Sequence, residues 1–434
     1  MSLTVATGET SLKILGGRLL DGQGMDSANV ALLIRNGQIV ATGEAALQAD
    51  ADTSFDAKAC VIAPGFVDLC CNLREPGSGQ KGNIASEARA AAHGGFTTVC
   101  ASPETSPVND SSAVTNLIRD MAGNTSIQVL PVGALTRGLE GELLSDMAGL
   151  ARAGCVALGN GSRPVRNARI LRRCMAYART FGLTVMLSPE NEALAADGYA
   201  HDGLVTSRLG LLGIPEVAET AAVMEMILLA EDTGVRLHLS QISCARSVEM
   251  IAEARRRGIA VTADVAMHQL VFTEDALAGF DSRFHVRPPL RSEADRKALI
   301  AGVRDGVITA IVSQHQPHDT AAKQAPLGAT EPGLSSVESV LSMGLGLVQQ
   351  GELSLEELVR ALGAGPASVI NRSASVAEGA PADLCVFDPD ARWVPGDTTL
   401  VSAGRHAPVI GEELPGVVRL TVAGGRIAWQ NPEK

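Results

Sequence analysis

Residues 63–77 read APGFVDLCCNLREPG. The part Gly65–Cys71 is almost continuously apolar, which indicates a strand buried on both faces. Similar runs follow at Phe96–Ala101, Ile127–Val132, Cys155–Gly159, Leu183–Leu187, Val235–Ile242, Ala260–Val265 and Val307–Ser313. Helical patterns lie between them, including Pro215–Glu231, Cys244–Arg257 and Ser292–Arg304. This alternation predicts an α/β fold, a (β/α)8 TIM barrel. A doubly wound open sheet is the alternative, but no Gly-rich phosphate loop follows the first strand.

The two ends of the chain lack this alternation of strands and helices and are rich in predicted strands instead. Ala31–Ala41 is predicted to be a hairpin that turns at Asn36-Gly37, and Leu420–Trp429 another that turns at Gly424-Gly425. Ala382–Phe387 adds a strand before the second hairpin. We therefore expect residues 1–62 and 376–434 to form one small composite β domain, and residues 63–375 to form the barrel.

The composition of the chain argues against several classes of function. The chain has 434 residues, 46% of them hydrophobic, and a net charge of -12, which disfavours nucleic acid or an anionic membrane as partner. No apolar run approaches the ~20 residues that span a bilayer. The first fifteen residues lack the basic and apolar regions of a signal peptide. The cysteines are scattered, which is typical of reduced thiols, so we expect a cytoplasmic protein.

The segment 68–77 resembles the dihydroorotase motif D-x-H-x-H-L-R-E-P-G. In that family, of the amidohydrolase superfamily, the two histidines bind zinc and the arginine binds the substrate carboxylate. This sequence keeps Asp68 and the run Leu73–Gly77, including Arg74, but has Cys70 and Asn72 in place of the histidines. Further motifs of the family, PGFVD, GGFTTV, RPPLR and ADLCVFDP, extend the resemblance from about Leu12 to Trp429. It implies an amidohydrolase-type barrel.

The resemblance also places the remaining site residues. The other metal-ligand positions are occupied by Asn160, Ser188, Gln241 and Gln314. Gln314 replaces the aspartate that is both ligand and catalytic base, and Ser188 begins the run SPEN where the family has H-C-E-D. Of the substrate positions, Arg74 and His318 are retained, whereas Glu104 and Arg287 replace asparagines.

These replacements predict that the chemistry is lost. Opening or closing a cyclic amide near neutral pH needs an activated water and a polarised carbonyl, which zinc supplies. Asn and Gln are weak neutral ligands, Ser is poor unless deprotonated, and an amide cannot act as a base. We therefore expect no catalytic residue, no bound zinc and no other cofactor.

Several side chains allow two interpretations. Cys70 is either a zinc ligand or reactive thiol, or a small residue that fills the space of a histidine. Arg74 and His318 either still bind a carboxylate or pair with acids such as Glu104. Arg287 and Glu104 either form a new site or, as we expect, an internal ion pair that partly fills the pocket.

The histidines after the seventh and eighth strands suggest a rebuilt metal site. His268, His315 and His318 lie there, but no carboxylate or thiolate clearly completes the set, so we do not expect one. The remaining histidines of helices and loops are expected at the surface: His93, His201 and His406.

The resemblance finally implies a role. Inactive homologues in this family associate with aspartate carbamoyltransferase and are needed for its assembly. We therefore expect a catalytically inactive structural subunit of pyrimidine biosynthesis, a homodimer within a larger hetero-oligomer, in a host with a separate active dihydroorotase. The alternatives are a cyclic-amide hydrolase with an altered or metal-free site, and a non-catalytic sensor that binds a carboxylate through Arg74.

Overall fold

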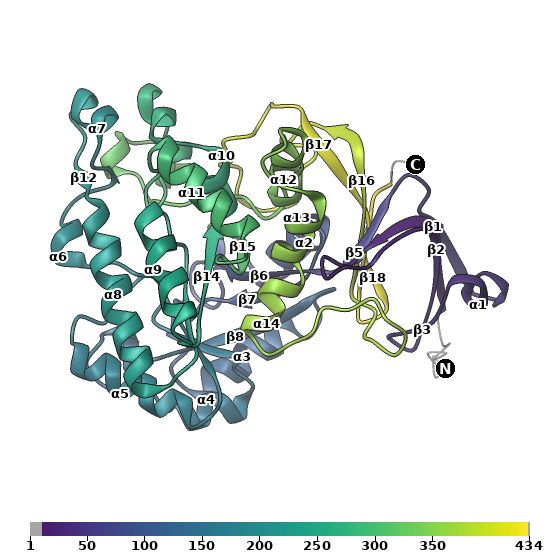
Figure 1. Cartoon of the computed structure of the whole chain (residues 1–434), viewed down its shortest axis with the longest axis horizontal. Helices are drawn as coiled ribbons and strands as arrows, with labels where there is room; N and C mark the ends of the chain where they lie inside the picture. Colours follow the sequence, from purple (N-terminus) through teal and green to yellow (C-terminus); the bar gives the residue numbers. More distant parts are fainter. Residues whose placement is uncertain (1–10, 433–434) are drawn as a thin grey trace.

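The computed structural model describes residues 11–432, which form a barrel and a β-sheet at its side (Figure 1). Eight parallel strands make the barrel sheet in the order β15-β14-β13-β10-β9-β8-β7-β6. All eight strands expected from the sequence are confirmed: β6 (Phe66–Cys71), β7 (Phe96–Ala101), β8 (Gln128–Ala134), β9 (Ala157–Gly159), β10 (Thr184–Leu187), β13 (Leu237–Leu239), β14 (Val261–Ala266) and β15 (Ala310–Val312).

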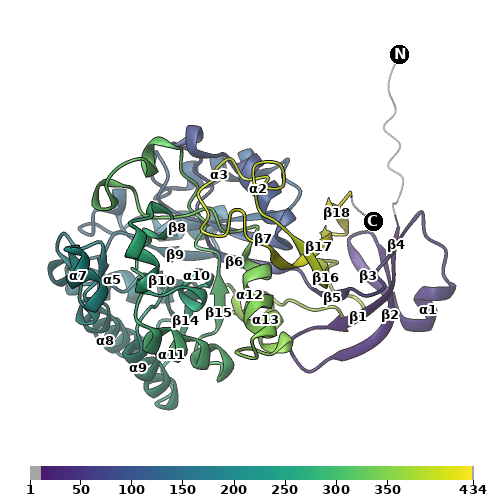
Figure 2. The same cartoon turned by 90° about the horizontal axis from the view of Figure 1, so that it is seen from above.

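Helices surround these strands on the outside (Figure 2). They are α2 (Ile84–His93), α3 (Ser112–Ala122), α4 (Met147–Ala153), α5 (Ala168–Arg179), α6 (Glu192–Ala195), α7 (Leu204–Leu209), α8 (Glu216–Thr233), α9 (Ala245–Arg256), α10 (Met267–Val271), α11 (Glu293–Arg304), α12 (Val340–Gln349), α13 (Leu355–Leu362) and α14 (Ala364–Val369). The two-stranded sheet of β11 (Ala200–His201) and β12 (Gly213–Ile214) lies between α6 and α8. Local signals begin several helices: Ser292 forms a capping box with Asp295 at the start of α11. None of the helices among residues 11–432 is long and apolar enough to cross a membrane.

The barrel is filled by apolar side chains and almost closes on itself. Its interior cluster includes Val67 and Leu69 of β6, Val132 of β8 and Met186 of β10. A much larger cluster lies between the strands and the surrounding helices. Near the open seam between β6 and β15, the Asn72 backbone N–H donates to the His315 carbonyl over 2.8 Å.

The second sheet joins the two ends of the chain. Its order is β18-β17-β16-β5-β1-β2-β3, and β4 also pairs with β1. These strands are β1 (Leu12–Leu20), β2 (Asp26–Arg35), β3 (Gln38–Thr42), β4 (Thr53–Asp56), β5 (Val61–Pro64), β16 (Leu384–Trp393), β17 (Leu414–Ala423) and β18 (Arg426–Gln430), with α1 (Gly43–Gln48) after β3. Antiparallel pairing of β5 with β16 links the N-terminal part to the C-terminal part. A composite β domain is thus present. The boundaries 62/63 and 375/376 stay a prediction, and residues 1–10 and 433–434 lie outside the described residues.

Both predicted hairpins are confirmed, and their turns pack against each other. Gly37 joins β2 to β3 with a φ of +80°, and Gly425 joins β17 to β18 with a φ of +76°. A Cβ on Gly425 would lie 2.5 Å from the Gly37 Cα atom. Only glycine allows both the left-handed backbone and this close approach.

Three phenylalanines connect the barrel to the β domain. Phe66 of β6 is fully buried, and its ring centroid lies 5.8 Å from that of Phe96 and 6.3 Å from that of Phe387. Phe96 belongs to β7 and Phe387 to β16, so the rings span the boundary between the two sheets. Burial of these rings therefore stabilises the position of one sheet against the other.

We predict that Phe66→Ala lowers the free energy of unfolding by about 3–5 kcal/mol, because it leaves a cavity at this junction. The exposed Phe280 offers a matched control, and Phe280→Ala should change it by less than about 0.5 kcal/mol. Urea unfolding of both variants measures the difference. Equal, small effects would show that the aromatic junction does not hold the sheets together.

Candidate functional site

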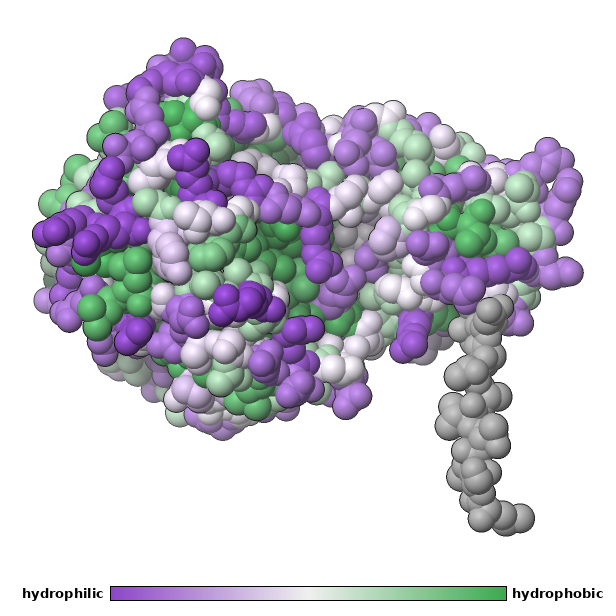
Figure 3. Space-filling model, turned by 90° about the horizontal axis from the view of Figure 1, so that it is seen from below, coloured by the Kyte–Doolittle hydropathy of each residue, from purple (hydrophilic) through white to green (hydrophobic). Residues whose placement is uncertain are grey.

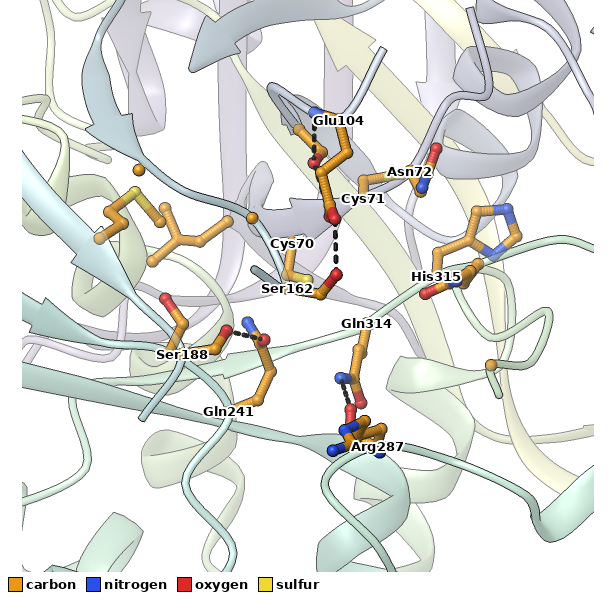
Figure 4. A pocket seen from close by; sticks show the side chains of 18 of the residues that line it. Cys70, Cys71, Asn72, Glu104, Ser162, Ser188, Gln241, Arg287, Gln314 and His315 are labelled. Carbon is orange, nitrogen blue, oxygen red and sulfur yellow. Dashed lines mark hydrogen bonds between the residues drawn. The ribbon is translucent and has the colours of Figure 1, made fainter. Parts of the chain in front are cut away.

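A cavity of about 210 Å³ lies at the carboxyl ends of the barrel strands, where barrels of this type place their functional residues. Figure 4 shows its polar side chains converging from different strands. Five of the six predicted ligand positions line it: Cys70, Asn72, Ser188, Gln241 and Gln314. The structure therefore brings most of the predicted positions together.

The substituted side chains are bonded to their surroundings. Ser188 donates to the Gln241 side-chain oxygen over 3.0 Å, and the Gln314 side-chain nitrogen donates to the backbone carbonyl of Arg287 over 2.7 Å (Figure 4). The Asn72 side-chain oxygen accepts from the backbone N–H of Arg74 over 3.0 Å. These bonds involve neutral amide and hydroxyl groups.

Cys70 and Cys71 both border the cavity at the end of β6, and Cys71 also packs in the outer core. Cys70 is half-buried. Burial first, and then the charges of Asp264, Asp68 and Glu104, raise the pKa of the Cys70 thiol well above its usual range. The thiolate form that would bind a metal or attack a substrate is therefore disfavoured.

Asn160 departs from the expected arrangement. It follows β9 but is fully buried and does not line the cavity. Its side chain accepts from Thr136 over 2.8 Å and donates to the carbonyl of Arg163 over 2.8 Å. Asn160 therefore ties its own loop to the segment after β8, and the sequence did not reveal this because Thr136 lies 24 positions away.

Arg74 and His318 also differ from what the sequence suggested. Neither lines the cavity. The Arg74 Nε donates to the carbonyl of Pro317 over 2.8 Å, and the His318 Nε2 lies 2.9 Å from the carbonyl of Pro332. Of the two interpretations left open, pairing with an acid is seen for His318, but the acid is Glu331, at 3.5 Å, and not Glu104.

The expected ion pair between Arg287 and Glu104 is wrong in its partner. Arg287 forms a bidentate pair with Glu190, at 2.9 and 2.6 Å. Glu104 instead accepts a 2.5 Å hydrogen bond from Ser162. Glu190 was missed, although it is the glutamate of the segment SPEN that matches the family's H-C-E-D.

Buried acid–base pairs lie beneath the cavity. His238 of β13 is 2.8 Å from Asp264 of β14, and Asp264 accepts from the backbone N–H of Gln241 over 2.6 Å. His315 is 2.8 Å from the carboxylate of Glu87. Burial alone would raise the pKa of Glu87, but the hydrogen bond and charge of His315 outweigh it and lower this pKa to about 2.

The three histidines considered for a rebuilt metal site have separate surroundings. His268 has no hydrogen-bond partner among the described residues, His315 pairs with Glu87, and His318 contacts Pro332. Within residues 11–432, no group of three or more His, Cys, Asp and Glu side chains is placed to hold a metal ion.

The histidines expected at the surface are half-buried: His93, His201 and His406. His93 shows the reason. Its Nδ1 lies 2.6 Å from Glu338, and its ring lies against the rings of Trp393 and Trp429. Both tryptophans come from the C-terminal strands, and the sequence alone did not place those strands beside α2.

The fold and the position of the cavity define an amidohydrolase-type barrel, and solved structures agree. L-Hydantoinase (dihydropyrimidinase) from Arthrobacter aurescens superimposes with a TM-score of 0.87 over 97% of this chain and 96% of that one, at 22% sequence identity. Dihydropyrimidinase from Brevibacillus agri has a TM-score of 0.84 over 97% of this chain and 95% of that one, at 21% identity. At these identities the likeness shows the fold alone.

Sequence comparisons give the family. A family model described as "Dihydro-orotase-like" matches residues 59–247. The chain is 46% identical over 423 residues to a "Dihydroorotase-like protein" of Pseudomonas aeruginosa, covering 97% of this chain and 100% of the relative. It is 41% identical over 423 residues to a "Dihydroorotase" of Anaeromyxobacter dehalogenans, covering 96% and 98%. The chain belongs to the dihydroorotase-like family of the amidohydrolase superfamily, a family of cyclic-amide hydrolases.

Buried histidines around the site predict a pH-dependent stability. Burial lowers the pKa of His268 to about 3 and those of His285 and His318 to about 4, below the usual 6.5. The unfolded chain takes up these protons first, so stability should fall as pH falls from 6.5 towards 4, by about 1.4 kcal/mol per pH unit for each proton. Asp68 has the opposite effect on stability, because burial raises its pKa to about 6 and the folded chain then takes up this proton first. The combined effect of the three histidines is larger than that of this one carboxyl group.

Urea unfolding at a series of pH values measures how the free energy of unfolding changes with pH. His268→Gln should reduce this change by the contribution of one proton, about 1.4 kcal/mol per pH unit. A free energy of unfolding that stays constant or rises as the pH falls through this range would contradict the assignment.

Proposed function

We propose that this chain is a non-catalytic member of its family that serves as a structural subunit of aspartate carbamoyltransferase. The observation that carries the first half is the hydrogen bond of Gln314. Its side-chain nitrogen donates to the Arg287 carbonyl over 2.7 Å, a role that an aspartate cannot fill. Gln314 occupies the position of the family's catalytic base, and an amide cannot transfer protons at neutral pH.

The donor set also does not fit the zinc that the family resemblance implies. Gln241 and Ser188 bond to each other, and Asn160 points away from the cavity into its loop. The thiol of Cys70 is the only good zinc donor at the six positions, and one thiol does not make a zinc site, which needs three or four such ligands.

An exposed apolar surface supports the second half of the proposal. Along the outside of α8, Val217, Met224 and Leu228 are each about half exposed. Their spacing places them on one side of the helix, while α8 also buries apolar residues on the other side. A helix that is apolar all round is normally covered on both sides. Apolar surface also lies among hydrophilic side chains at the barrel end of the molecule (Figure 3).

We infer that this outer row of α8, which we call the α8 row (Val217, Met224 and Leu228), is covered in the assembly. Two-fold pairs of the chain would link trimers of the transferase into a closed complex. Such contacts need about 1,000 Å² or more of buried surface. The host then makes dihydroorotate with a separate enzyme.

We predict that the purified protein shows no detectable cyclisation of carbamoyl aspartate or hydrolysis of dihydroorotate. The double variant Cys70→His and Asn72→His should stay inactive, because Gln314 still stands in place of the base. Catalytic groups act together, so restoring some of them does not restore activity. The host's active dihydroorotase, assayed in parallel, is the positive control. Turnover by the unmodified protein that disappears in Cys70→Ser would refute the proposal.

We also predict that the chain co-purifies with the host's aspartate carbamoyltransferase and enlarges it on a sizing column. The double variant Val217→Lys and Met224→Lys should lose this complex, because two buried charges in an apolar contact are costly. A matched control changes the exposed pair Leu117 and Met121 of α3 to lysine and should leave the complex intact. The assembly role is wrong if the transferase reaches full size and activity without this chain.

A further inference from the structure

The cavity at the barrel mouth carries a net negative charge. Its charged lining residues, histidines aside, are two glutamates and one arginine. Arg287 is neutralised by its bidentate pair with Glu190, at 2.9 and 2.6 Å. The remaining charge is the carboxylate of Glu104. Arg74, the cation that would attract a carboxylate in the family, is held by the Pro317 carbonyl outside the lining.

The electrostatic field at the floor has the same sign. Two further carboxyl groups lie behind the cavity wall. Asp264 pairs with His238 at 2.8 Å, and Asp68 accepts hydrogen bonds from the backbone N–H and the hydroxyl of Ser313. A second negative charge placed in this cavity is therefore repelled, and a positive one is attracted.

Glu104 is fixed in its position rather than free to turn away. Its carboxylate accepts a hydrogen bond from Ser162 at 2.5 Å (Figure 4) and a longer one from Ser102 at 3.4 Å. Gly161 lies directly against it, because a Cβ there would come 2.4 Å from the Glu104 Cγ atom. The two hydroxyl donors and the neighbouring glycine therefore hold the Glu104 carboxylate in one position at the cavity.

Two residues of the cavity lining, His268 and Gln314, carry buried polar atoms without a partner among the described residues. His268 is 98% buried, since only 2% of its surface is exposed, and neither ring nitrogen has a partner among the described residues. The Gln314 Oε1 is likewise buried without a partner. Its orientation is fixed, because the amide nitrogen must face the carbonyl of Arg287. Burying such groups without a hydrogen bond is costly, so they favour a ligand that supplies one.

We propose that this cavity binds a small organic cation rich in N–H donors, of the amidinium or protonated-amine class. The carboxylate of Glu104 takes the charge, and the Gln314 oxygen and one nitrogen of neutral His268 accept N–H groups. The hydrocarbon part lies against the apolar walls, which include Leu69, Val132 and Met186. The preference is the reverse of the carboxylate binding that Arg74 would give. It is independent of the assembly role, because either can hold without the other.

Three probes of nearly one shape and different charge test the proposal on the unmodified protein. Benzamidine is a cation with several N–H donors, benzamide is neutral, and benzoate is an anion. Isothermal titration calorimetry should detect benzamidine at concentrations up to about 10 mM, benzamide more weakly, and benzoate not at all. Absence of benzamidine binding, or benzoate binding as tight as benzamidine, would overturn the proposal.

Variants locate the binding. Glu104→Gln should weaken benzamidine about tenfold or more and leave benzamide unchanged, because only the charge is removed. His268→Phe should weaken both probes, and Glu356→Gln, an exposed carboxylate on α13, should weaken neither. Thermal unfolding confirms that each variant is folded. If Glu104→Gln binds benzamidine as tightly as the unmodified protein, the cation is not held at this site and the proposal fails.

Discussion

The seam between the first and last barrel strands is the contact on which the site depends. Asp68 of β6 is fully buried and accepts hydrogen bonds from the backbone N–H and the hydroxyl of Ser313, which follows β15. The backbone of Asn72 donates to His315, and His315 in turn pairs with buried Glu87. The segments that follow both strands are therefore joined by a direct hydrogen bond between their backbones. The end of β6 and these segments carry Cys70, Asn72 and Gln314, which match metal-ligand positions in the family resemblance, and the seam fixes how these residues face the cavity.

The hydrogen bonds among the neutral side chains of the cavity follow from the cost of leaving buried polar groups unpaired. Ser188 and Gln241 satisfy each other, and Gln314 uses a backbone carbonyl. The backbone keeps left-handed conformations at two of these positions, with φ of +53° at Gln241 and +50° at Gln314. Non-glycine residues seldom adopt such angles, and they cluster at functional sites. These backbone angles place Gln241 and Gln314 at the cavity, where each side chain forms a hydrogen bond with a neighbouring group.

The sequence was sufficient to predict the features that depend on neighbouring residues alone. Each buried strand is a short apolar run, and each hairpin has its own turn residues, so the barrel strands and both hairpins could be predicted. The sequence did not predict which side chains contact each other in the site. Arg287 was expected to meet Glu104 but reaches Glu190, and Asn160 turns into its loop, because loop paths decide which groups meet. The surroundings of His93 depend on two tryptophans more than 290 positions along the chain, which no local pattern specifies.

We propose above all that the side chains at the six family ligand positions cannot hold zinc. Elemental analysis of protein purified from zinc-supplemented cells tests it most directly, with a zinc-binding dihydroorotase prepared in the same way for comparison. The account predicts only trace zinc, unchanged in Cys70→Ser. One or more zinc ions per chain, lost in Cys70→Ser, would contradict it.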